Sequence, residues 1–254
     1  GLLGIAGAAV SRQVLATYSY PLSFGICFLF CFMAQVMSWI ALSLNREPAQ
    51  KPNSESRSAR DYFRCLPSVL REKPNFARYL ISRALIILGG MAAPFYIIYA
   101  RRAFHISDAF AANLTIAALI SQTVATPLLG WLGDRRGHKW LTELSVLIGL
   151  GAVVLALVAP HEGWFYPIFV LMNAATSGLV VAGHAMVLEF GGSDVPTVTA
   201  LASTLLAIPI LLTPILGGWL ADTLGFQALF IVAMVFIGAG WCTIHWTVRE
   251  PRYE

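Results

Sequence analysis

The stretch "GWLGDRRGHK", residues 130–139, decides the fold class of this chain because it recurs as "GWLADTLGFQ" at residues 218–227. Gly, Trp, Leu, Asp and a final Gly keep the same spacing in both copies, and the lead-ins "TPLLG" and "TPILGG" are also similar. The second copy has lost every positive charge. This pattern predicts two turns of similar shape that lie in different electrostatic surroundings.

The composition indicates a membrane protein. Of the 254 residues, 57% are hydrophobic and only 12% are charged, whereas roughly 25% of a soluble domain is charged. The net charge of +4 does not indicate nucleic-acid binding, because the 17 Lys and Arg residues lie in short connections rather than on one basic face. The four cysteines show neither a disulfide framework nor a metal-ligand spacing, and no cofactor is expected.

The apolar runs predict seven complete membrane spans, because about 20 residues of helix cross a hydrocarbon core. An apolar run at residues 1–18 is interpreted as the end of a further helix, so the chain is expected to be a fragment. Ser107 or Asp108 is placed to cap the span that follows it. The predicted spans are residues 21–44, 79–100, 109–133, 141–160, 164–190, 196–221 and 225–247.

The distribution of Lys and Arg predicts the orientation in the membrane. If the connection after residue 45 is cytoplasmic, the cytoplasmic segments hold thirteen of these residues and the external segments three. Three spans separate Asp134 from Asp222, so the two repeat copies face opposite sides. The last six spans are therefore interpreted as two three-helix units of inverted topology, an arrangement typical of secondary transporters.

The first repeat copy resembles the loop signature of the major facilitator superfamily, which joins the second and third helices of each six-helix half. The resemblance implies an all-α membrane bundle made of the C-terminal six-helix half and the last one and a half helices of the N-terminal half. It also implies the boundaries 1–45 for the end of the N-terminal bundle, 46–77 for a cytoplasmic central loop and 78–254 for the C-terminal domain. The signature positions are Gly130, Asp134, Arg135, Gly137 and Lys139.

The resemblance implies secondary active transport of a small molecule by alternating access, without enzymatic activity. The signature is expected to act as a cytoplasmic gate whose partner lies in the missing N-terminal half. The expected location is the cell membrane, crossed several times, with the C-terminus in the cytoplasm. Substrate, direction and coupling ion stay open, although His184 is the titratable candidate if transport is proton-coupled.

Polar and aromatic side chains at membrane depth are the candidates for a substrate cavity, because polar groups there face protein or water rather than lipid. Packing between helices is the alternative interpretation. Arg83, near the cytoplasmic end of its span, extends either to the membrane interface or into a cavity. Residues 59–73 suit an amphipathic interfacial helix or a solvated loop. The candidate cavity residues are Tyr96, Tyr99, Gln122, Asn173, Ser177 and His184.

Two other functions compete with transport. A channel or a non-transporting membrane protein would show a similar hydropathy pattern. An intramembrane hydrolase is suggested by Ser177 and His184, but seven residues of helix separate them by about 10.5 Å of rise, beyond hydrogen-bond reach.

Overall fold

A computed structural model of the chain describes residues 7, 10, 11, 13, 14, 17–45, 70–192 and 194–253. Residues 46–69 of the predicted central loop, and with them most of its amphipathic segment, lie outside the described residues, and α4 begins at Pro74, inside the predicted loop bounds. The chain divides into two units, residues 1–63 and 64–254. The first unit contains α2 (Leu22–Ser43), an apolar helix long enough to cross a membrane.

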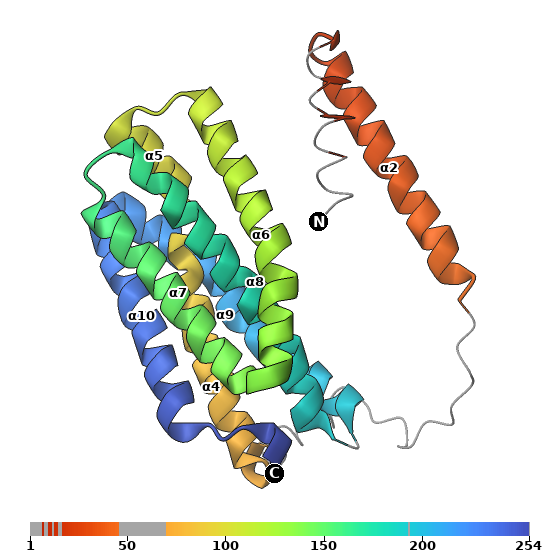
Figure 1. Ribbon diagram of the computed structural model, residues 1–254, viewed down its shortest axis with the longest axis vertical. Helices are drawn as coiled ribbons and strands as arrows, with labels where there is room; N and C mark the ends of the chain where they lie inside the picture. Colours follow the sequence, from red (N-terminus) through yellow and green to blue (C-terminus); the bar gives the residue numbers. More distant parts are fainter. Residues whose placement is uncertain are drawn as a thin grey trace. The chain divides into compact units, whose positions relative to one another are not determined.

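The second unit is a helical bundle whose elements follow one another through short connections (Figure 1). Its helices are α4 (Pro74–Gly89), α5 (Phe95–Phe104), α6 (Asp108–Arg136), α7 (His138–Val158), α8 (Phe165–Gly191), α9 (Val195–Thr223) and α10 (Gly225–Thr247). Across both units, seven helical segments of the described residues are long and apolar enough to span a membrane. They coincide with the predicted spans, and the described part of the chain contains no strand, which confirms the all-α fold class.

One helix starts as the sequence predicts, and one predicted span is broken. Ser107 is the N-cap of α6, and its hydroxyl accepts a hydrogen bond from the backbone N–H of Phe110 at 3.2 Å. The span that begins at Pro74 is interrupted by a 3₁₀ turn, Gly90–Ala92, and resumes after Pro94. Proline removes a backbone donor and disfavours continuous helix, so α4 and α5 form one broken span.

The two repeat copies form turns of similar backbone shape at opposite ends of the bundle. The final glycine of each copy has positive φ, 99° at Gly137 and 85° at Gly225, a region that residues with a Cβ rarely adopt. Gly137 lies against Glu250, which follows α10. Phe226, next to Gly225, lies instead against Tyr99 near the end of α5. Because α7, α8 and α9 lie between the two turns, the helix order agrees with two three-helix units of inverted topology.

Small residues bring the backbones of α4 and α10 close together, as is common between membrane helices. A Cβ added to Gly89 would lie 2.9 Å from the backbone nitrogen of Ile237, and one added to Gly240 would lie 3.2 Å from that of Ile86. The buried hydroxyl of Ser82 donates to the carbonyl of Gly240 at 2.8 Å. These contacts join the first half of the broken span to the last helix.

Candidate functional site

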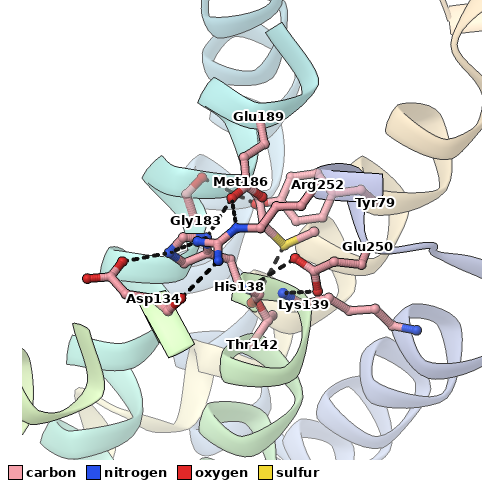
Figure 2. Close-up of polar contacts among 10 residues, drawn as sticks. All are labelled: Tyr79, Asp134, His138, Lys139, Thr142, Gly183, Met186, Glu189, Glu250 and Arg252. Carbon is pink, nitrogen blue, oxygen red and sulfur yellow. Dashed lines mark hydrogen bonds and ion pairs between the residues drawn. The ribbon is translucent and has the colours of Figure 1, made fainter. Parts of the chain in front are cut away.

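The signature turn between α6 and α7 is capped by a residue far along the chain. Both carboxylate oxygens of Glu250 accept backbone hydrogen bonds at the start of α7, from His138 and from Lys139, each at 3.1 Å (Figure 2). A carboxylate at a helix N-terminus satisfies free N–H groups and is favoured by the helix dipole. A Cβ at Gly137 would lie 2.8 Å from this carboxylate, so the glycine also makes room for the cap.

An arginine two residues further on ties three elements together at the same end of the bundle. Arg252 donates from Nε to Glu189 of α8 at 2.6 Å and from Nη1 to the backbone carbonyl of Asp134 at 3.1 Å. The Glu189 carboxylate also contacts Nδ1 of the buried His138 at 2.8 Å. The hydrogen bond to Glu189 is the largest of the effects that raise the pKa of Arg252. The C-terminal segment, residues 249–252, thereby links α6, α7 and α8.

A second contact of this segment reaches α4. The Asn75 side chain donates to the carbonyl of Arg249 at 3.1 Å and accepts from the Arg249 backbone N–H at 2.8 Å. Because both groups of one amide are used, this reciprocal pair fixes the direction in which the chain leaves α10. One end of the bundle is therefore closed by hydrogen bonds from the C-terminal segment to four helices.

The charged members of the signature point in different directions. The Asp134 side chain is 77% exposed, and its carboxylate lies 3.7 Å from the ring of His138. Arg135 stacks over the ring of Trp131 at 4.0 Å. Lys139 donates to the carbonyl of His245 at 3.2 Å and lies 3.6 Å from Glu143. Most of the Asp134 side chain is thus exposed.

Gly130 marks a contact between α6 and α8. A Cβ added there would lie 3.9 Å from the side chain of Val181, an ordinary packing distance. Unlike Gly137, this position therefore has room for a methyl group.

A cavity with a volume of about 740 Å³ lies between α4, α8 and α9. That volume falls within the range of small-molecule sites in proteins. Most of its walls are aliphatic, and its polar lining is confined to a few side chains. The polar groups are Tyr79, Arg83, His184, Thr199 and Ser203.

Of the six predicted cavity residues, His184 lines this cavity. Tyr96 is buried against Phe230, with ring centroids 5.4 Å apart. Tyr99 packs among the rings at the other end of the bundle, including Phe165 at 6.0 Å. The structure therefore places the two tyrosines in aromatic packing and does not bring them to the cavity beside His184.

The predicted polar cavity residues of α8 bond to backbone carbonyls of their own helix. Asn173 donates to the carbonyl of Phe169 at 2.9 Å, and Ser177 donates to the carbonyl of Asn173 at 2.9 Å. Gln122 is exposed on α6. The polar link between α6 and α8 is made by Ser121, whose hydroxyl donates to the carbonyl of Val170 at 2.7 Å. A role of Gln122, Asn173 and Ser177 in substrate binding stays a prediction.

Sequence reasoning missed Glu250, Arg252 and Asn75 as parts of the site. The arginines after the last span counted only as orientation charges, and Glu250 between them carried no separate signal. Glu250 alternating with cations directly after a span, in "REPR", is the feature that could have suggested a folded-back segment. The backbone N–H group of His138, to which Glu250 bonds, lies more than 100 residues earlier in the chain, so no local sequence pattern could connect the two.

A bundle of membrane-length helices, with inverted three-helix units and a cavity between helices, defines the class of polytopic membrane proteins built like secondary transporters. Residues 79–254 match the family model of the Major Facilitator Superfamily. This match covers more than half of the chain, so the chain belongs to the Major Facilitator Superfamily.

Two curated relatives are similar to the chain over different lengths. The MFS-type transporter SLC18B1 of Rattus norvegicus is 23% identical over 246 residues, which cover 89% of this chain and 51% of the rat protein. The multidrug resistance protein MdtG of Dickeya zeae is 30% identical over 131 residues, which cover 50% of this chain and 31% of that protein. The chain thus spans about half, or less, of the relatives that it matches.

Proposed function

We propose that this chain forms part of a secondary transporter that carries a small molecule across the cell membrane by alternating access. The observation that carries the proposal is the cavity of about 740 Å³ between α4, α8 and α9, in a chain that belongs to a family with named transporters. The helices around this cavity form one wall of the transport site. Its α4 and α8 walls reach the end of the bundle that holds the signature turn.

The signature turn is the gate at the cytoplasmic end. The excess of Lys and Arg in the segments at this end supports the cytoplasmic orientation. Glu250 and Arg252 hold the turn from within the bundle, which leaves the exposed Asp134 carboxylate to pair with a partner outside it. Forming and breaking that pair biases the protein between two states, since an ion pair present in only one state shifts the equilibrium toward it.

The test places a single cysteine on the cavity wall. Ser203 is exposed toward the cavity, and Ser203→Cys would be made in the complete protein after Cys27, Cys31, Cys65 and Cys242 are replaced. We expect a membrane-impermeant thiol reagent to label it from either side of oriented vesicles. Adding Asp134→Asn should raise labelling from the cytoplasmic side and lower it from the outside, and should slow transport without changing the membrane yield.

Val235→Cys is the matched control, because this exposed α10 residue does not line the cavity. Lipid is expected to cover this position on a membrane-length helix, so Val235→Cys should resist a water-soluble reagent in every condition. Labelling of Ser203→Cys from one side alone, whatever the state of Asp134, would contradict alternating access and favour a channel vestibule or a static pocket. Unimpaired transport by Asp134→Asn would reduce the signature to an orientation signal.

A further inference from the structure

The cavity contains one cationic side chain among its lining residues, Arg83 of α4. Arg83 follows Tyr79 by four residues, so the two side chains project from the same face of the helix. The rise of an α-helix puts Arg83 about 13.5 Å along the axis from Pro74, in the first third of the membrane-length segment Pro74–Phe104. The side chain is only partly exposed and faces α8.

The guanidinium group lies against bare backbone on α8. A Cβ built on Gly183 would lie 2.9 Å from Nη2 and 3.3 Å from Cζ of Arg83. The hydroxyl of Tyr79 donates to the carbonyl of the same glycine at 3.4 Å. The absence of a side chain at Gly183 therefore leaves room for the guanidinium group on the wall of the cavity.

The charge of Arg83 has no counter-ion among the residues that the structure describes. Within that same part of the chain, its buried Nε has no hydrogen-bond partner. Among the described residues, the cavity lining contains no carboxylate, and its other polar groups are hydroxyls and the ring of His184. An uncompensated cation in an apolar surrounding is costly, and an anion that binds beside it removes that cost.

We infer that the cavity takes an organic anion, a compact oxyanion group on an apolar body, and that Arg83 is the residue that selects the charge. This inference rests on the proposed transport function and names the class of its substrate. Guanidinium offers a planar fork of donors that suits carboxylate, sulfonate or phosphonate oxygens. The aliphatic walls formed by Val180, Leu206 and Ile210 cover the apolar body.

The experiment compares three probes that share one apolar body and differ in charge. They are naphthalene-2-sulfonate, 2-naphthyltrimethylammonium and 2-naphthalenemethanol, and their binding to the purified complete protein is measured by equilibrium dialysis with naphthalene fluorescence. We expect the sulfonate to bind most tightly to the unaltered protein. Arg83→Gln should weaken sulfonate binding roughly ten- to a hundredfold, the usual effect of losing a hydrogen bond to a charged group, and should leave the alcohol unchanged.

Three further variants separate the roles of charge, geometry and stability. Arg83→Lys keeps the charge but not the fork, so we expect an intermediate loss of sulfonate binding. Gly183→Ala puts a methyl group against the guanidinium group and should weaken sulfonate binding without any change in charge. Arg102→Gln removes a cation that stacks on Phe226 at the far end of the bundle, and it should leave the binding of all three probes unchanged.

Equal binding of the three probes to the unaltered protein, or no sulfonate binding up to millimolar concentration, would overturn the inference. An unchanged charge preference in Arg83→Gln would overturn it as well and would indicate that Arg83 pairs with a carboxylate elsewhere in the protein. Labelling of Ser203→Cys from both sides is measured separately. Retained two-sided labelling with no anion preference would therefore reject the substrate class and leave alternating access intact.

Discussion

The cap that Glu250 places on α7 makes a quantitative prediction about stability. Glu250→Ala removes the acceptor of two backbone N–H groups at the start of α7. Loss of an N-terminal cap costs about 1 kcal/mol, and loss of a carboxylate from the positive end of a helix costs about 0.5 kcal/mol at a partly exposed position. We therefore expect Glu250→Ala to lower the free energy of unfolding by about 1.5 kcal/mol.

The neighbouring glycine supplies a test of the geometry. Gly137 has φ 99° and ψ 151°, and an alanine in this region costs about 2 kcal/mol in backbone strain. Its methyl group would also displace the Glu250 carboxylate, so Gly137→Ala alone should cost about 3.5 kcal/mol, the strain together with the lost cap. In the double variant the cap is lost only once. Its expected cost is about 3.5 rather than 5 kcal/mol, which is a coupling of about 1.5 kcal/mol.

The assay is reversible unfolding of the purified protein in mixed micelles of increasing dodecyl sulfate content, followed by tryptophan fluorescence. Glu162→Ala is the matched control, because Glu162 is exposed at the opposite end of the bundle and should change the free energy little. Additive costs in the double variant, or an unaltered free energy for Glu250→Ala, would show that the carboxylate does not cap α7 in the folded protein.

Two other predictions concern topology and packing. In oriented vesicles with an otherwise cysteine-free protein, Arg136→Cys should be labelled only from the cytoplasmic side and Thr223→Cys only from outside, since both residues are exposed. Labelling of both from one side would contradict the inverted arrangement. Gly240→Val should lower the unfolding free energy by about 2 kcal/mol, because the larger side chain overpacks against Ile86. Gly238→Val is the control and should change this free energy little, because a Cβ at Gly238 meets nothing within 4 Å. Equal effects of the two variants would refute the close helix contact.

The spans could be predicted from the sequence because hydropathy and helix length are local properties. The Ser107 cap was predicted for the same reason, since it depends on residues within one turn. Contacts between distant segments could not be predicted in this way. Their polarity at membrane depth marked Asn173 and Ser177 as cavity candidates, but it could not show that both side chains bond to carbonyls of their own helix.

The candidate site was predictable only in part, because the signature gives residue types and not their partners. Arg83 was assigned either to the interface or to a cavity, and only the bare backbone at Gly183 on another helix places its guanidinium group on a cavity wall. The sequence could not show that Glu250 caps α7, because the hydrogen-bond donors to its carboxylate are backbone N–H groups, and no pattern of side chains reveals these.

The close backbone contact between α4 and α10 has a consequence for how the cavity changes shape. Gly89 against Ile237 and Gly240 against Ile86 leave no space for sliding, and the Ser82 hydrogen bond crosses the same interface. We therefore expect the half-span that carries Arg83 to move together with the last helix. Any change in the width of the cavity then requires α8 or α9 to move relative to this pair, and Pro209 and Pro214 inside α9 are positions where that helix can bend.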